Sequence, residues 1–113
     1  MSYVPRRGDI VWLSFDPQAG HEQAGHRPAF VVSPEAYNRK TGLFLACPIT
    51  SKVKGYPFEV ALPGDLEVGG VILADQVKSL DWKARRAKFA TTTSRQVINK
   101  VTALVLPLID EDA

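Results

Sequence analysis

The apolar periodicity of this chain changes once, close to its C-terminal end. Between residues 94 and 109, apolar side chains recur at the i, i+3, i+4 and i+7 spacing of an amphipathic helix; they are Val97, Ile98, Val101, Leu104, Val105 and Leu108. Thr93 or Ser94 could cap this helix, and Pro107 disfavours helix beyond Leu106. Before this segment the chain consists of short β-rich runs between turn signals. The pattern therefore predicts several strands followed by one terminal helix.

The expected strands lie between glycine, proline and polar residues. They span residues 9–15, 28–33, 43–49, 58–62, 71–74, 76–80 and 87–92, with one helical turn at 33–37 and a turn at 38–42. Two polar loops, 16–26 and 50–56, lie between them, and loops of such length in a small chain are often functional. The whole pattern predicts one mostly β domain over residues 1–113, with a strongly bent sheet or small barrel and a C-terminal helix.

Length and composition limit the classes of protein to which the chain can belong. With 113 residues, 45% of them hydrophobic and 23% charged, it has the makeup of a single globular domain. The longest apolar runs, 43–49 and 103–109, are far shorter than the roughly 20 residues of a membrane helix, and the start does not resemble a secretory signal. We therefore expect a cytoplasmic protein without a membrane span.

The single cysteine, Cys47, lies within an apolar run, where a buried structural thiol is far commoner than a nucleophile. One cysteine and two histidines are too few for a structural zinc site. We expect no bound metal and no cofactor.

The formal net charge of +2 conceals an uneven distribution. Three acidic residues lie in the tail 110–113, which we expect to be flexible, so residues 1–109 carry 14 basic and 9 acidic side chains. Residues 76–100 hold only Asp81 as an acid but several bases, namely Lys78, Lys83, Arg85, Arg86, Lys88, Arg95 and Lys100. This distribution suits a polyanionic partner, although a solvated basic surface would have the same composition.

Several catalytic motifs are missing from the sequence. It has no phosphate-binding loop of nucleotide hydrolases, no Gly-x-Ser-x-Gly elbow and no paired-histidine metal spacing. The two polar loops instead offer groups that can hold a phosphodiester and move protons around it. These are Glu22, His26 and Arg27 in the first loop, and Thr50, Ser51, Lys52 and Lys54 in the second.

Four motifs stand in order along the chain: EQAGHRPA at 22–29, PIT at 48–50, KGYPFE at 54–59 and LADQVKS at 73–79. With shorter matches, such as GD at 8–9 and FDP at 15–17, they span almost the whole chain. In residues and spacing they resemble the MazF/PemK/Kid toxin family, and the first motif resembles MazF more than the Kid branch. The segment after Leu80 matches this family less closely.

This resemblance implies a homodimer of small SH3-like β-barrels of the PemK/CcdB kind, each a strongly bent antiparallel sheet with a C-terminal helix. It implies a toxin of a toxin-antitoxin system: a sequence-specific, metal-independent endoribonuclease (an mRNA interferase) that cleaves single-stranded RNA and is neutralised by a cognate acidic antitoxin. Arg27 and Thr50 match the family's catalytic arginine and threonine. Glu22 matches an acidic residue needed for activity in MazF.

These residue types suit attack by a ribose 2′-hydroxyl on its own phosphate, which needs neither water nor metal and leaves 2′,3′-cyclic phosphate and 5′-hydroxyl ends. Arg27 would bind the phosphate oxygens with two parallel N–H groups, and Thr50 would donate its hydroxyl. Glu22 is the first candidate for the base that takes the 2′-proton. His26 and, by resemblance to the Kid branch, Asp75 are the alternatives.

The candidate substrate-binding residues are Ser51, Lys52, Lys54, Tyr56, Phe58, Asp75, Gln76 and Lys78. Purely structural roles remain open for several candidates. Arg27 could form an ion pair with Glu22 or Asp16, His26 could orient its loop, and Thr50 and Ser51 could be ordinary strand-end hydroxyls. Asp75 could pair with Lys78, and Tyr56 or Phe58 could belong to the core rather than stack on bases.

Two other functions remain as alternatives. A CcdB-like toxin would inhibit a protein target such as gyrase without cutting RNA, but its action depends on a C-terminal Trp that the ending IDEDA lacks. A non-catalytic RNA-binding module is the third hypothesis.

Overall fold

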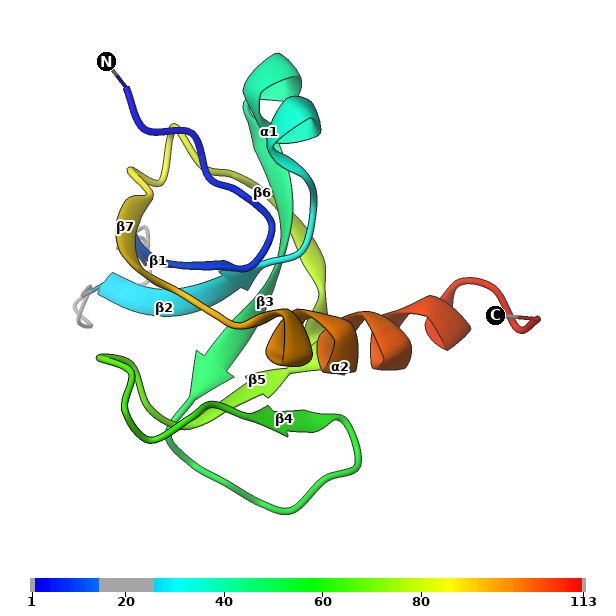
Figure 1. The fold of residues 1–113 in the computed structure, drawn as a ribbon. Coiled ribbons are helices and arrows are strands. Elements are labelled where there is room, and N and C mark those ends of the chain that lie inside the picture. Colours follow the sequence, from blue (N-terminus) through cyan, green and yellow to red (C-terminus); the bar gives the residue numbers. More distant parts are fainter. Residues whose placement is uncertain (1, 15–25, 113) are drawn as a thin grey trace, which may run out of the picture.

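The structure is a computed structural model that describes residues 2–14 and 26–112. Its elements, with η denoting a 3₁₀-helix, are β1 (Asp9–Ser14), β2 (His26–Val31), α1 (Glu35–Thr41), β3 (Leu43–Thr50), β4 (Glu59–Ala61), β5 (Val71–Leu73), η2 (Ala74–Gln76), β6 (Lys78–Asp81), β7 (Lys88–Thr92), α2 (Arg95–Val105) and η3 (Leu106–Leu108) (Figure 1). The mostly β architecture with a C-terminal helix is confirmed. None of the helices in the described ranges has the length and apolar character needed to cross a membrane.

The strands form one seven-stranded sheet in which six follow the order β4-β5-β3-β2-β1-β7 and the seventh, β6, pairs with β3 off this path; every pairing is antiparallel. The long strand β3 organises it, because β6 pairs with the beginning of β3 and β5 pairs with its last two residues. Figure 1 shows how the other strands bend around β3. In the described part of the chain the path from β4 to β7 does not close, so the sheet is barrel-like but open.

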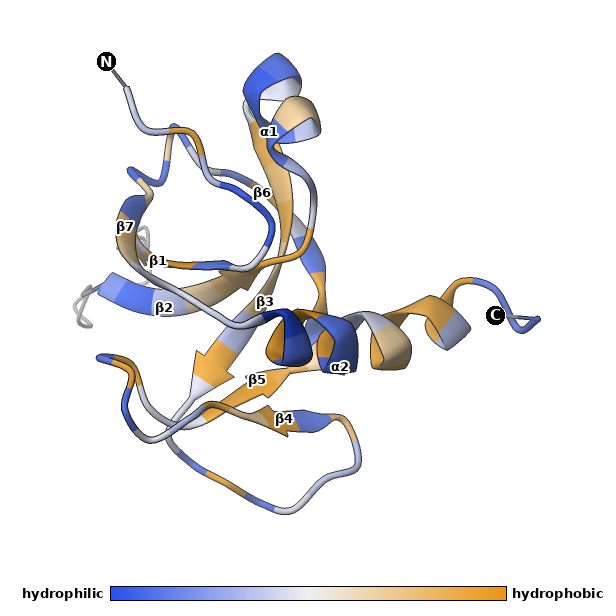
Figure 2. Ribbon diagram, viewed as in Figure 1, coloured by the Kyte–Doolittle hydropathy of each residue, from blue (hydrophilic) through white to orange (hydrophobic). Residues whose placement is uncertain are grey.

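Side chains from the two faces of the sheet form two apolar cores, because neighbouring residues of a strand point to opposite faces. One core joins Ile10, Phe30 and Cys47 to the buried valines of α2, Val97, Val101 and Val105. The other contains Val11, Leu13, Ala29, Val31, Phe44, Ala46 and Trp82. Figure 2 shows the apolar residues along β3 and β5 and the polar residues at the start of α2. The C-terminal helix therefore covers one face of the sheet.

The observed strands lie within two residues of their predicted bounds wherever the structure describes them. α2 begins after Ser94, whose Oγ accepts a hydrogen bond of 3.3 Å from the N–H of Val97. Thr93, the alternative cap, instead donates its hydroxyl to the carbonyl of Gly8 at 2.7 Å. The α-helix gives way to η3 at Leu106, directly before Pro107, as the sequence predicts.

Two expected boundaries are wrong. His26 and Arg27 do not belong to a loop, because β2 begins at His26 and these residues pair with Ser14 and Leu13 of β1. Backbone hydrogen bonds do not require apolar side chains, so a strand can extend beyond its apolar residues. The helical turn expected to end at residue 37 continues through Thr41 as α1, which ends where Gly42 adopts a left-handed φ of 76°.

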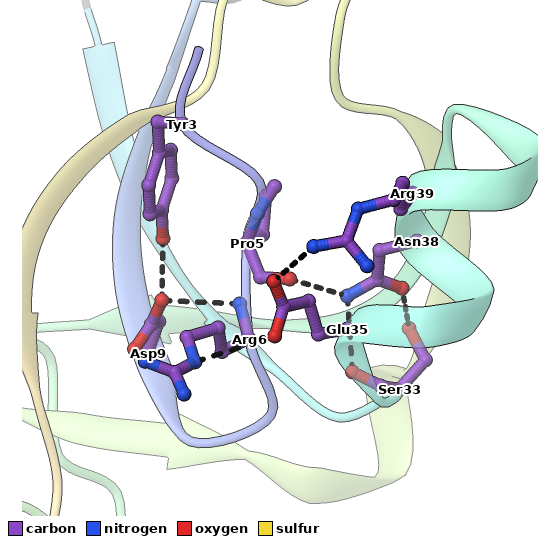
Figure 3. Close-up of polar contacts among 8 residues, drawn as sticks. All are labelled: Tyr3, Pro5, Arg6, Asp9, Ser33, Glu35, Asn38 and Arg39. Carbon is purple, nitrogen blue, oxygen red and sulfur yellow. Dashed lines mark hydrogen bonds and ion pairs between the residues drawn. The ribbon is translucent and has the colours of Figure 1, made fainter. Parts of the chain in front are cut away.

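A buried polar network ties the N-terminal segment to α1 (Figure 3). The side chain of Asn38, 0% exposed, donates to the carbonyls of Pro5 at 2.9 Å and Ser33 at 3.0 Å, and accepts the hydroxyl of Ser33 at 2.5 Å. The backbone carbonyl of Asn38 accepts a hydrogen bond of 3.0 Å from the indole N–H of Trp82. One residue thus joins the N-terminus, α1 and the turn after β6.

Replacement of this residue by an apolar one should destabilise the fold. We expect Asn38→Leu to lower the free energy of unfolding by about 2–4 kcal/mol, because it leaves two buried carbonyls without a donor. Urea denaturation measures this. The control is Asn99→Leu on the exposed side of α2, expected to change stability by less than about 0.5 kcal/mol. Equal shifts in the two variants would show that the network does not stabilise the protein.

Candidate active site

The register between β2 and β3 brings Arg27 and Thr50 together at one end of the sheet. Ala29 lies opposite Pro48, and Phe30 lies opposite Cys47. Arg27 precedes Ala29 by two residues and Thr50 follows Pro48 by two, so both lie just beyond this paired segment at the same end of the two strands, and both line the same clefts. Residues from two separate motifs of the sequence therefore meet.

Arg27 and Thr50 both line two clefts, which also share Pro28 and Ile49. The first cleft, of about 600 Å³, is further lined by the polar side chains of Gln76, Lys78 and Arg85. The second cleft, of about 550 Å³, is further lined by Trp12, His26, Ser51, Lys52 and Glu67. The pair thus stands where the two clefts meet.

The first cleft is positively charged. Its described lining includes Arg27, Lys78 and Arg85 but no acidic residue, and most of the other lining residues are apolar. Lys78 and Arg27 are exposed to solvent, whereas Arg85 is half-buried. Cations around a concave surface attract a polyanion, and guanidinium groups bind phosphate oxygens through paired N–H donors.

The hydroxyl of Thr50 is held in a defined position. Its Oγ1 accepts a hydrogen bond of 3.1 Å from the backbone N–H of Lys52. A hydroxyl oxygen that accepts one hydrogen bond still has its proton to donate. Thr50 can therefore act as a fixed donor towards a group bound beside Arg27.

His26 lies on the other side of the strand from Arg27, because successive residues of a strand point to opposite faces. Of the two clefts, His26 lines only the second, where it is exposed. Asp75 is exposed in η2 and lines neither cleft. Glu22 lies outside the described residues, so the structure does not select the base among the three candidates.

The loop after β3 is shaped by Glu59. Its carboxylate accepts the backbone N–H groups of Lys54 at 3.0 Å and Gly55 at 2.9 Å. The Lys54 ammonium lies 5.8 Å from the ring centroid of Tyr56, and the Tyr56 side chain is 57% exposed. Phe58 is half-buried. Lys54 and Tyr56 are thus exposed and line neither cleft, while Ser51 and Lys52 line the second cleft.

Cys47 is a core residue, as the sequence predicts. It is 0% exposed, and its thiol donates to the carbonyl of Ala74 at 3.8 Å. Burial, and secondly the negative charge of Asp75, raise the pKa of Cys47 to about 12. The thiolate that a nucleophile requires is therefore disfavoured at neutral pH.

Sequence reasoning did not single out Arg85 and Glu67 as site residues. Arg85 is fixed in the turn after β6, where its carbonyl accepts the N–H of Ser14 at 2.8 Å. The basic stretch 76–100 includes Arg85, but no pattern shows which of its cations faces the cleft. Glu67 is one of two acids in the loop between β4 and β5, and only the packing of this loop places Glu67, and not Asp65, at the second cleft.

A family model described as "PemK-like, MazF-like toxin of type II toxin-antitoxin system" matches residues 6–109. The endoribonuclease toxin MazF of Escherichia coli strain K12 is 52% identical over 107 residues, which cover 95% of this chain and 96% of that protein.

Solved structures show the same relationship. A MazE-MazF crystal structure from Deinococcus radiodurans superimposes with a TM-score of 0.91 at 55% identity, over 96% of this chain and 97% of that chain. A mycobacterial endoribonuclease in complex with its cognate antitoxin superimposes with a TM-score of 0.72 at 25% identity, over 92% and 96% of the two chains. The chain therefore belongs to the family of PemK-like, MazF-like toxins of type II toxin-antitoxin systems.

Proposed function

We propose that this chain, an endoribonuclease toxin like its MazF relative, cleaves single-stranded RNA by attack of a ribose 2′-hydroxyl on the adjacent phosphate. The observation that carries the proposal is the shared position of Arg27 and Thr50 in a cleft lined by further cations. This arrangement supplies positive charge and a hydroxyl donor at one point. Both groups stabilise a phosphate that gains negative charge in the transition state.

In the proposed reaction, the 2′-oxygen forms a bond to phosphorus while the bond from phosphorus to the 5′-oxygen breaks. Arg27 donates two N–H bonds to the non-bridging oxygens, and Thr50 donates its hydroxyl to the same phosphate. A base takes the 2′-proton, and the departing 5′-oxygen gains a proton. Glu22 is our first candidate for the base, with His26 and Asp75 as the alternatives.

The remaining candidates have binding roles in this proposal. Lys78, Arg85 and Lys52 line the clefts and would hold the phosphates that flank the scissile one. Ser51 and Gln76 would bond to base edges, as polar side chains do in single-stranded RNA recognition. The exposed ring of Tyr56 and the Lys54 ammonium would contact bases outside the clefts. Phe58 and Asp75 line neither cleft, so their positions do not support a role in RNA binding.

We further propose that the toxin acts in the cytoplasm as a homodimer and is inhibited by an acidic antitoxin. Its mycobacterial structural relative is described in complex with a cognate antitoxin, which supports this kind of partner. Exposed apolar side chains, among them Phe89 at 53% and Ile109 at 76%, leave surface for association with another protein chain. The exposed bases of residues 76–100 suit an acidic segment. Nothing in the comparisons favours the CcdB-like alternative.

The test of the proposal is incubation of the purified toxin with a long RNA in excess EDTA. We expect discrete fragments, because Arg27 supplies the positive charge that a metal ion supplies in other nucleases. Fragmentation only after addition of Mg²⁺ would contradict the metal-independent mechanism. RNA that is bound but intact under both conditions would instead favour a non-catalytic RNA-binding module.

A further inference from the structure

The loop 62–70, which joins β4 to β5, is pressed against the end of β3 beside Thr50. Gly70 has a φ of 111°, and a Cβ atom at this position would lie 2.2 Å from the carbonyl oxygen of Thr50. Only glycine allows so close an approach. The N–H of Leu62 donates to the carbonyl of Gly70 at 3.0 Å and closes the loop at its base. The loop backbone is thus set directly beside the residue that we place at the scissile phosphate.

The two neighbours of Glu67 anchor it in this loop. Val68 is 4% exposed and belongs to the same apolar core as Ile49 and Leu62, and Leu66 packs against that core. With both neighbours held inward, the exposed side chain of Glu67 lines the second cleft together with Arg27 and Thr50. The position of this carboxylate therefore follows from packing.

A carboxylate in this cleft limits what can bind beside it. Glu67 is the only acidic residue in the described lining of the second cleft, and the described residues form no hydrogen bond or ion pair with its carboxylate. An ionised carboxylate repels phosphate and can only accept hydrogen bonds. Its partner in a bound RNA must therefore be a donor.

The donors in an RNA are the exocyclic amino groups and ring N–H groups of its bases and the ribose 2′-hydroxyls. Among these, the exocyclic amino groups are the donors that carboxylates accept in base readout; adenine, cytosine and guanine carry one, whereas uracil offers only its ring N–H. The half-buried ring of Trp12 lines the same cleft and offers a surface on which a base can stack. The second cleft thus combines an aromatic surface, an acceptor and the phosphate-binding Arg27, which are the three parts of a nucleotide site.

We propose that Glu67 is a specificity-determining residue, which accepts a hydrogen bond from the exocyclic amino group of a base next to the scissile phosphate. The toxin therefore selects a base with an amino group at that position and disfavours uracil. This inference rests on the proposed cleavage of RNA at Arg27 and Thr50.

The test compares bases that differ only in the amino group. Sequencing the new 5′ ends of a long RNA cut by the unmodified toxin defines its preferred site. Each base flanking the cut is then replaced, in short oligonucleotides, by an analogue without its amino group, such as inosine for guanosine or purine riboside for adenosine. At one of the positions that flank the cut, we expect the loss of the amino group to lower the kcat/KM of the unmodified toxin about tenfold or more.

The variants connect that loss to Glu67. We expect Glu67→Ala to cleave the preferred site about tenfold less efficiently than the unmodified toxin. This variant should cleave the natural substrate and the analogue without the amino group with the same kcat/KM. Glu67→Gln keeps a neutral acceptor and should retain part of the discrimination. The matched control is Asp65→Ala, which removes the same charge from an exposed position of the same loop that lines neither cleft, and it should discriminate like the unmodified toxin.

Two outcomes overturn the inference in distinguishable ways. If Glu67→Ala cleaves all sequences faster with unchanged base preference, the carboxylate only repels phosphate and is not a specificity determinant. If the unmodified toxin leaves every RNA intact, the proposed function itself fails.

Discussion

Arg27→Ala is expected to lower kcat for RNA cleavage by about 10²–10³-fold or more while leaving thermal unfolding nearly unchanged. The guanidinium is the group that we place on the phosphate as it gains negative charge, and the alanine variant has no donor at that position. Arg27 is exposed at the start of β2, so its truncation removes little packing from either core. Single-turnover cleavage of an oligonucleotide, alongside a melting curve, measures both effects.

Two further variants make this result specific. Arg27→Lys keeps the charge but loses the parallel N–H donors, so its activity should lie between those of the unmodified toxin and Arg27→Ala. Arg39→Ala is the matched control: Arg39 lies on α1, pairs with Glu35 at 2.6 Å and lines neither cleft. It should retain full activity. Activity of Arg27→Ala within tenfold of the unmodified toxin would exclude Arg27 as the electrostatic catalyst.

An oligonucleotide with deoxyribose immediately 5′ of the scissile phosphate is expected to bind the toxin and remain uncut. The substitution removes the attacking oxygen, while the bases and phosphates that contact the clefts are unchanged. The modified strand should therefore inhibit cleavage of ordinary RNA in competition. A gel of the labelled strand and an inhibition curve measure the two properties.

The control for this experiment is the same strand with its single deoxyribose moved several nucleotides away from the cleavage site. It should be cut at nearly the rate of the all-ribose strand. Cleavage of the strand that is modified at the scissile position would show that another nucleophile, such as water, attacks the phosphate.

The local signals in the sequence predict the local structure. Ser94 caps α2 because its hydroxyl can accept the N–H of Val97, and Pro107 follows the end of the α-helix because it cannot donate to a preceding carbonyl. Both effects depend on residues within one turn of the chain. The beginning of β2 at His26 was missed because pairing with β1, a contact between distant residues, extends that strand.

The meeting of Arg27 with Thr50 illustrates what a strand pattern leaves open. The pattern indicates two strands, but their register decides which residues lie opposite each other. The family motifs indicated that both residues belong to one site, and the pairing of Ala29 with Pro48 gives the physical reason. Gln76 and Lys78 reach the same cleft because η2 and β6 continue along β3.

Arg85 and Glu67 could not be recognised from the sequence for a different reason. Each depends on a turn whose position is set by distant contacts: Arg85 by its bond to Ser14, and Glu67 by the packing of Gly70 on Thr50. No periodicity marks such a residue. The density of basic residues in 76–100 suggests that some of them bind a polyanion, whereas nothing in the sequence distinguishes Glu67 from Asp65 in the same loop.

The most direct test of the proposed mechanism is mass spectrometry of the two fragments that the toxin produces from one oligonucleotide in EDTA. Attack by the 2′-hydroxyl predicts an upstream fragment that ends in a 2′,3′-cyclic phosphate and a downstream fragment that begins with a free 5′-hydroxyl. A downstream fragment with a 5′-phosphate would contradict this mechanism and the catalytic roles assigned to Arg27 and Thr50.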